Sequence, residues 1–270
     1  MTRRPQLLGS RPLAEAERSA FHAAGHLQRP EVFTPEELAA YRPALREYIL
    51  DKHARLLPGE RAMGASAQDT VFSLGDAPEA VAAFVTAPRL GALAAGLLGV
   101  AAVRLLHFTG FFKPAGGPPT PWHQDLAFIP LDSDRVLSVW IPLSDVTPDM
   151  GGLVFASGSH QQGPQPPSAV GRFPLARNGP MRAGDLSLHM GWTLHASLKN
   201  TSRAPREALA VCFYADGARI ASPRQPLFAQ SLLASYFAGL RPGEPAVGPL
   251  NPIVFQRDDA VPPFPSPEER

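Results

Sequence analysis

The sequence is short of cysteine, of excess charge and of long apolar runs, and each shortage excludes a class of protein. A single cysteine, Cys212, among 270 residues rules out an internal disulfide and fits a reducing compartment. The 25 basic and 24 acidic residues give a net charge of +1, which removes the electrostatic argument for a nucleic-acid or membrane-surface partner. The longest uncharged apolar run, residues 90–103, is shorter than the ~18 residues that a membrane span needs.

No secretory leader is expected, because only a short apolar stretch follows Arg3 and Arg4. The sequence therefore predicts a cytoplasmic protein with no nucleic-acid or membrane partner. Its length fits one domain over residues 1–270, at roughly 100–200 residues per domain. Proline (31) and glycine (23) make up a fifth of the chain, which argues against a helical bundle and favours short strands joined by turns.

Residues 1–100 are predicted to be mainly helical. Thr34, Pro35 and Glu37 form a helix start of the capping-box type, with proline at the first helical position. Apolar residues recur at helical spacing after this start, and two further helices are expected downstream. Residues 57–75 show no period and are expected to form a loop over a site.

After residue 100 the pattern changes to short strands separated by glycine and proline. Helices followed by many short strands are typical of an α+β protein, here with a mainly β core, a β-sandwich or jelly roll, over residues 101–220. Residues 221–270 are expected to be a C-terminal extension, and residues 163–180 a surface loop. The strands are expected at 103–108, 136–143, 185–189 and 208–215.

The most informative local motif is Trp122-His123-Gln124-Asp125. On a strand, His123 and Asp125 point to the same face, which places an imidazole beside a carboxylate. These are two of the three ligands of the 2-His-1-carboxylate site for non-haem Fe(II). His195 follows a later strand and is a candidate third ligand. Arg206 is expected on the adjacent antiparallel strand, where its guanidinium can bind a dicarboxylate through two hydrogen bonds.

Several neighbouring polar or bulky residues have simpler interpretations. Trp140 fits core packing as well as a pocket wall. Lys113 precedes a proline in a glycine-rich loop, which predicts a solvated charge. His107 fits either a core position or the pocket, and His189 is expected to line the cavity without binding metal. Cys212 lies mid-strand and is expected to be a buried small hydrophobe.

Taken in order, the motifs of residues 104–218 resemble the phytanoyl-CoA dioxygenase family, whose members are Fe(II)- and 2-oxoglutarate-dependent oxygenases. The resemblance implies a double-stranded β-helix with N-terminal helices packed on it, and Fe(II), 2-oxoglutarate and O2 as cofactors and co-substrates. The motifs that carry it are Lys113-Pro114-Ala115-Gly116-Gly117, Trp122-His123-Gln124-Asp125, Trp140-Ile141-Pro142-Leu143, Gly151-Gly152-Leu153, Gly158-Ser159-His160, and Gly184-Asp185 leading to His195, Ser197, Asn200 and Arg206.

The resemblance also implies roles for individual residues. Its iron ligands, which form the catalytic centre, fall on His123, Asp125 and His195. Its co-substrate contacts fall on four residues. Arg206 would pair with the distal carboxylate of 2-oxoglutarate, and Ser197, Thr109 and Trp140 would contact the co-substrate or line the pocket nearby. Because the carboxylate ligand is present at Asp125, hydroxylation is expected rather than the halogenation of relatives that lack it.

The expected reaction is the hydroxylation, or another oxidation, of an unactivated C–H bond in a small organic molecule, with decarboxylation of 2-oxoglutarate to succinate. Aromatic and aliphatic residues near the metal motif indicate a largely apolar pocket for a natural-product-like substrate. They are Phe108, Phe111, Phe112, Phe128 and Ile129.

Two other functions remain open on the residues alone. A cupin-like protein that binds metal or a small molecule without turnover would keep the same barrel and ligands. A Zn2+ hydrolase would use the same His, Asp and His side chains. Arg206 argues against both, because neither needs an anchor for a dicarboxylate.

Overall fold

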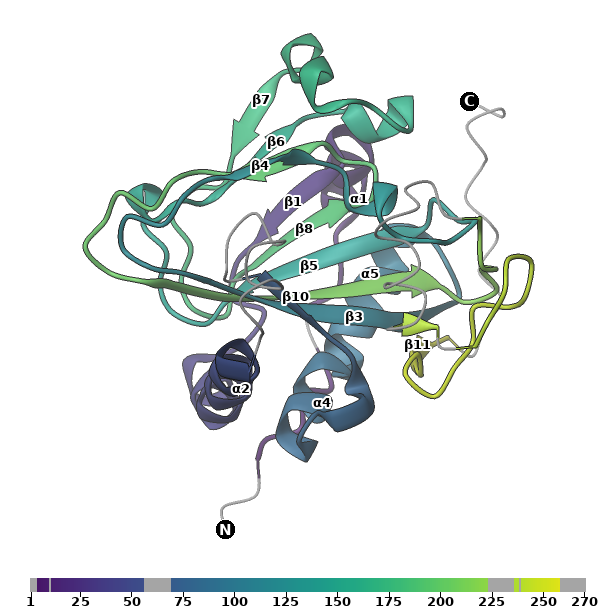
Figure 1. Ribbon diagram of the computed structural model, residues 1–270, viewed down its shortest axis with the longest axis horizontal. Coiled ribbons are helices and arrows are strands. Elements are labelled where there is room, and N and C mark those ends of the chain that lie inside the picture. Colours follow the sequence, from purple (N-terminus) through teal and green to yellow (C-terminus); the bar gives the residue numbers. More distant parts are fainter. Residues whose placement is uncertain (1–3, 10, 56–68, 223–235, 238, 258–270) are drawn as a thin grey trace.

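The computed structural model describes residues 4–9, 11–55, 69–222, 236–237 and 239–257. Two antiparallel sheets face one another, and helices cover the outer face of the larger sheet (Figure 1). The helices are α1 (Glu15–Ala24), α2 (Pro35–Arg55), α4 (Glu79–Val85) and α5 (Pro88–Leu98), with short 3-10 segments η1 (Leu74–Asp76), η2 (Asp125–Ala127), η3 (Pro148–Met150), η4 (Ser159–Gln162) and η5 (Pro167–Arg172).

The larger sheet has seven strands in the order β1-β8-β5-β10-β3-β11, with β2 also paired to β3. The smaller sheet has the order β4-β9-β6-β7. This arrangement confirms the mainly β core with N-terminal helices. The strands are β1 (His26–Arg29), β2 (Asp69–Phe72), β3 (Ala102–Lys113), β4 (Thr120–His123), β5 (Val136–Pro142), β6 (Leu153–Ala156), β7 (Leu175–Arg177), β8 (Leu186–Met190), β9 (His195–Ser197), β10 (Arg206–Ala215) and β11 (Ile253–Gln256).

The start of α2 is the capping box that the sequence predicts. The Thr34 backbone N–H donates to Glu37 Oε2 at 3.0 Å, and the Glu37 backbone N–H donates to Thr34 Oγ1 at 3.1 Å. The Glu37 carboxylate also accepts two hydrogen bonds from Arg89 of α5, at 2.6 and 2.8 Å. One side chain therefore caps α2 and ties it to α5.

Helices α4 and α5 form the apolar layer behind the larger sheet. Pro88 begins α5 after two intervening residues, and Gly99 ends α5 in the left-handed conformation at φ 66°. The stretch Glu79–Leu98 is long and apolar enough to cross a membrane by composition alone, with a mean hydropathy of 1.6. Some 72% of that stretch is buried inside the fold, so it serves here as core.

Alternation along the strands of the larger sheet separates a cavity face from a helix face. His107, Thr109 and Phe111 of β3 line the cavity, whereas Phe108 packs into the core beneath the helices. Phe112 packs against the same core. The expectation that Phe108 and Phe112 face the pocket is therefore wrong, because both lie on the even-numbered face of β3.

Strands also form where helix or loop was expected. β1 and β2 come from the first hundred residues, and both join the larger sheet. β2 lies within the expected loop 57–75, of which residues 57–68 lie outside the described residues. β7 pairs with β6 inside the expected loop 163–180. These strands are three or four residues long, too short for a period-two pattern to stand out.

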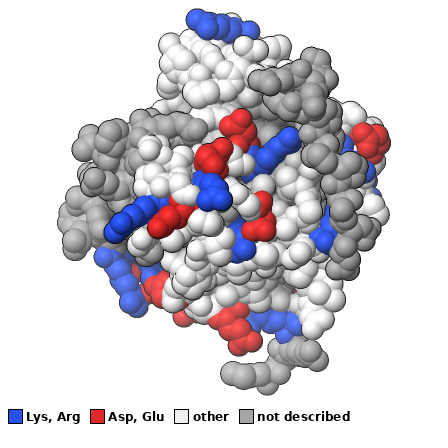
Figure 2. Space-filling view, turned by 90° about the vertical axis from the view of Figure 1, so that its right-hand side faces the viewer, with Lys and Arg blue, Asp and Glu red and all other residues white. Residues whose placement is uncertain are grey.

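The C-terminal segment contributes to the same sheet, because β11 pairs with the start of β3. On the surface, basic and acidic side chains are interspersed over the face shown in Figure 2, without a large area of one sign among the described residues. This distribution agrees with the net charge of +1.

Candidate metal and co-substrate site

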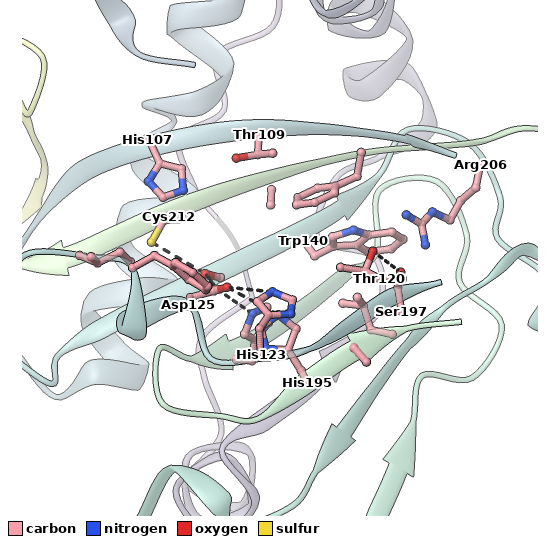
Figure 3. A pocket seen from close by; sticks show the side chains of 18 of the residues that line it. His107, Thr109, Thr120, His123, Asp125, Trp140, His195, Ser197, Arg206 and Cys212 are labelled. Atoms are coloured by element: carbon pink, nitrogen blue, oxygen red, sulfur yellow. Dashed lines mark hydrogen bonds and ion pairs between the residues drawn. The ribbon is translucent and has the colours of Figure 1, made fainter. Parts of the chain in front are cut away.

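A cavity of about 300 Å3 lies between the two sheets (Figure 3). His123, Asp125 and His195 sit in its middle, Arg206 at one end and His107 at the other. The larger sheet supplies β3, β5, β8 and β10 to its wall, and the smaller sheet supplies β4, β6 and β9. The cavity therefore draws its polar groups from segments far apart in the sequence.

The three predicted metal ligands converge. β4 and β9 pair so that His123 stands directly opposite His195. Asp125 Oδ1 lies 3.5 Å from His123 Nε2 and 3.6 Å from His195 Nε2. Potential ligand atoms of all three residues lie within 4.8 Å of one another. This spacing suits one metal ion bound between the three atoms.

The local backbone differs from the expectation that one strand carries both His123 and Asp125. β4 ends at His123, and Asp125 begins the 3-10 segment η2. Gln124 between them is nevertheless extended, at φ −122° and ψ 127°, so the strand alternation continues through it. Its buried side-chain amide donates to the carbonyl oxygens of Trp192 at 2.6 Å and Gly163 at 3.0 Å, which fixes this junction.

Backbone carbonyls set the tautomers of the two histidines. His123 Nδ1 lies 2.8 Å from the oxygen of Pro121, and His195 Nδ1 lies 2.9 Å from that of Thr193. A carbonyl oxygen only accepts, so each Nδ1 donates and each Nε2 keeps its lone pair for a metal. Burial, reinforced by the neighbouring His123 and His189 rings, holds the pKa of His195 well below its usual range, which keeps the imidazole neutral.

Two neighbours orient the Asp125 carboxylate. Ser138 Oγ donates to Oδ2 at 2.6 Å, and His189 Nε2 lies 3.1 Å from the same oxygen. Oδ1 is left facing the two ligand histidines. Burial opposes ionisation, but the surrounding histidine rings outweigh it and hold the pKa of Asp125 well below its usual range.

The donor set fits Fe(II). Two neutral imidazole nitrogens and one carboxylate oxygen on one side of a cavity form the 2-His-1-carboxylate arrangement, which leaves the opposite side open to small molecules. The roles of His123, Asp125 and His195 as ligands remain predictions, and the geometry supports them.

Arg206 lies in the cavity wall, but not where the sequence placed it. β10 belongs to the larger sheet and β9 to the smaller one, so Arg206 faces His195 across the cavity rather than from an adjacent strand. Its side chain is 2% exposed and donates to the carbonyl oxygen of Gly151. Its guanidinium carbon lies 5.3 Å from the centre of the Trp140 ring, a cation–π contact.

Lys113 is a second buried cation at this end, and the expectation of a solvated charge is wrong. It is 2% exposed and stands opposite Arg206 in the β3–β10 register. Its ammonium donates to Ser197 Oγ at 2.7 Å and to the Leu198 carbonyl at 2.8 Å. Ser197 Oγ donates in turn to Thr120 Oγ1 at 2.8 Å. β3 runs to Lys113, and period-two alternation from Thr109 was the signal that would have placed Lys113 on the cavity face.

The sequence also missed a polar row that crosses the larger sheet. His107 pairs with Cys212, Cys212 with Ser138, and Ser138 with His189. Two residues along the strands, Thr109, Ala210 and Trp140 form the next row. Thr109 and Trp140 both line the cavity, and their contacts with a co-substrate stay predictions. Such rows depend on strand register, which no single strand reveals.

Comparison with protein families agrees with this geometry. The family model "Phytanoyl-CoA dioxygenase (PhyH)" matches residues 21–208. A 1-deoxypentalenic acid 11-beta-hydroxylase of Streptomyces arenae is 33% identical over 104 residues, or 32% of this chain and 36% of the relative. A probable alpha-ketoglutarate-dependent hypophosphite dioxygenase of Stutzerimonas stutzeri is 40% identical over 50 residues, or 18% of each chain. The matches thus span about a third or less of either curated relative.

Solved structures share the fold over most of the chain. The carbocyclase SnoK from nogalamycin biosynthesis, described as non-haem and alpha-ketoglutarate-dependent, matches with a TM-score of 0.74 at 24% identity, over 89% of this chain and 96% of its own. EctD from S. alaskensis, solved with 2-oxoglutarate and 5-hydroxyectoine, matches with a TM-score of 0.68 at 22% identity, over 82% of this chain and 86% of its own.

Proposed function

The chain belongs to the phytanoyl-CoA dioxygenase family, and from this we propose that it is an Fe(II)- and 2-oxoglutarate-dependent oxygenase that hydroxylates an unactivated C–H bond of a small organic molecule. The observation that carries the proposal is a complete His123, Asp125 and His195 triad in the same cavity as a buried Arg206. Metal ligands alone would also suit a hydrolase, but the same cavity also holds a buried guanidinium, which can bind the carboxylate of a co-substrate through two hydrogen bonds.

When bound, Fe(II) with 2-oxoglutarate supplies the activation of O2 and the oxidation of the C–H bond, with succinate and CO2 as the other products. The protein supplies position and charge. His123, Asp125 and His195 hold the metal from one side. Ser138 and His189 fix which oxygen of Asp125 faces it.

Arg206 is the residue that we expect to bind the distal carboxylate of 2-oxoglutarate. Its guanidinium lies against Trp140, which leaves few rotamers open to it. Ser197 and Thr120 form a hydroxyl pair nearby, held by the Lys113 ammonium, and can add hydrogen bonds to the same carboxylate. Thr109 lines the wall between Arg206 and the triad. Together these groups would orient the co-substrate toward the metal.

The substrate end is largely apolar. Phe111, Phe128 and Ile129 line the cavity, as the sequence predicts. Apolar walls exclude water from the metal, which favours oxidation of the substrate over unproductive turnover. A small neutral molecule fits this lining. The carbon of that molecule that lies next to the metal would be the one oxidised. We place the reaction in the cytoplasm, as the single cysteine suggests.

Succinate formation tests the proposal. The purified full chain should convert 2-oxoglutarate to succinate only when Fe(II) and O2 are both supplied, even without substrate, at a slow basal rate. His195→Ala and Asp125→Ala should each abolish that conversion, because either change removes a ligand. Trp122→Phe is a suitable control, since this neighbouring side chain does not line the cavity.

Full turnover in either ligand variant would contradict the proposal. Metal binding with no succinate from the wild-type chain would instead favour the cupin-like binding protein. Hydrolysis of a substrate that proceeds equally well with Zn2+ in place of Fe(II), and without O2, would favour a hydrolase.

A further inference from the structure

Three polar side chains close the end of the cavity that lies beyond the triad from Arg206. His107 of β3 and Cys212 of β10 are direct neighbours across the strands. Tyr236 comes from the segment after β10 and stacks on His107, with ring centres 4.8 Å apart and planes 17° apart. All three line the cavity, and Figure 3 shows His107 and Cys212 on the far side of Asp125 from Arg206. Neither metal binding nor co-substrate binding uses them.

The His107 ring has hydrogen-bonding capacity that the fold leaves unused. Nδ1 is buried, and no described residue hydrogen bonds to the ring. The His107 side chain is partly exposed and lines the cavity. Its exposed part therefore faces the cavity. Burial lowers the pKa of His107 to about 4, which makes the ring neutral near pH 7, with one N–H and one lone pair.

The rest of this end is also uncharged. Burial raises the pKa values of both Cys212 and Tyr236, so the thiol and the phenol keep their protons. Phe128 and Ile129 add apolar surface. Among the described residues that line the cavity, Arg206 is the one basic side chain with a fixed charge, and it lies at the opposite end.

We propose that His107 and Tyr236 bind a hydroxyl group of an uncharged and otherwise apolar substrate. The inference rests on the proposed oxygenase function and names the substrate class of the same cavity. A hydroxyl donates and accepts, so it pairs with the neutral His107 ring in either tautomer. A hydrocarbon would leave the hydrogen-bonding capacity of the ring unused, including that of the buried Nδ1. A carboxylate or phosphate would be a buried anion without a cation beside it.

The proposal predicts a binding order within one skeleton. The probes are indane, indan-1-ol, 1-methoxyindane and indane-1-carboxylate, titrated calorimetrically into the anaerobic complex of the full chain with Fe(II) and 2-oxoglutarate. Indan-1-ol should bind about tenfold more tightly than indane, the range expected for one satisfied buried polar group. The methyl ether, which only accepts, should lie between them, and the carboxylate should bind most weakly.

Variants that keep the ring shape assign the effect to the two side chains. His107→Phe preserves the stack on Tyr236 and should reduce the preference for the alcohol over indane to less than about twofold. Tyr236→Phe removes only the hydroxyl and should reduce the same preference about threefold. His53→Phe, on α2 and outside the cavity lining, makes the same chemical change and should retain the full preference.

The inference is overturned if the His107→Phe chain, shown folded by circular dichroism, keeps the alcohol preference. It is also overturned if the carboxylate binds as tightly as the alcohol, or if the wild-type chain shows no alcohol preference. Should His107→Phe fail to fold, an unchanged preference in Tyr236→Phe overturns it instead. Succinate formation, measured on the same wild-type preparation, separates the two levels: succinate without an alcohol preference refutes only this inference, whereas absent succinate refutes the oxygenase.

Discussion

The two ends of the cavity hold polar groups of opposite character. At one end, Arg206 and Lys113 are buried cations that stand side by side in the β3–β10 register. At the other, His107, Cys212 and Tyr236 keep neutral forms because burial disfavours their charged ones. β3 and β10 run through both ends, so the difference comes from which residues alternate onto the cavity face.

This contrast indicates a division of labour. A buried cation suits a partner that is always ionised near neutral pH, such as the carboxylate of 2-oxoglutarate. Neutral donors and acceptors suit a partner recognised by its shape and by one hydrogen bond. The triad lies between the two ends of the cavity. The following changes test whether these three zones act separately.

The largest effect is expected at the cationic end. Arg206→Ala should raise the apparent KM for 2-oxoglutarate about 100-fold, because truncating one partner of a buried charge pair leaves the other charge unpaired. Arg206→Lys keeps the charge but not the planar guanidinium, so its KM for 2-oxoglutarate should lie between those of wild type and Arg206→Ala. Steady-state succinate formation measures both. Fe(II) affinity should stay within twofold of wild type, and an unchanged KM would show that another cation, with Lys113 the nearest, binds the carboxylate.

An intermediate effect is expected in the middle zone. Ser138→Ala removes the 2.6 Å hydrogen bond to Asp125 Oδ2 and should weaken Fe(II) binding about tenfold, as loss of a group that orients a ligand typically does. Anaerobic metal titration measures it. Ser187→Ala is the matched control, because Ser187 is equally buried on the same face of the sheet and does not contact Asp125.

Once iron is saturating, the KM for 2-oxoglutarate in Ser138→Ala should equal that of wild type. A raised KM at saturating iron would show that the middle zone and the cationic end are coupled.

The smallest effect concerns pH at the neutral end. Below the unfolded pKa of about 6.5 the unfolded chain takes up a proton at His107, whereas the folded chain does so only near pH 4, where its pKa lies. The free energy of unfolding should therefore fall as pH falls from 6.5 to 4. His107→Phe should remove about 1 kcal/mol of that fall, as measured by urea denaturation at pH 7 and pH 5.5. His53→Phe should leave the slope closer to wild type, and equal slopes in all three chains would contradict a neutral buried His107.

The sequence predicted those features that repeat a local pattern. The capping box at Thr34 and Glu37, the buried stripe that follows on α2, and the strands β5 and β10 appear where the spacing placed them. β3 also begins where expected, but it continues past residue 108 to Lys113. Family resemblance placed the residues of the triad and of Arg206, which the fold brings into one cavity.

Features that depend on pairing between distant segments could not be read in advance. The sequence placed Arg206 beside His195 in one sheet, because it gave no sign that the chain crosses to the other sheet between them. Lys113 was expected in solvent, since its burial depends on Ser197 and Leu198 of the opposite sheet. His107 was ambiguous because Tyr236, which covers it, lies more than a hundred residues further along the chain.

The pairing of β1 with β8 sets the order in which the protein can take shape during synthesis. His26 leaves the ribosome early, but its partner His189 follows only after most of the chain has been made. Contacts so distant in sequence form late and slowly. A nascent chain that ends before His195 carries two of the three ligands, and its first strand still lacks the neighbour that holds it in the sheet. With the predicted ligand set, coordination of iron can be completed only after His195 has been made, and capture of iron by a shorter fragment is disfavoured.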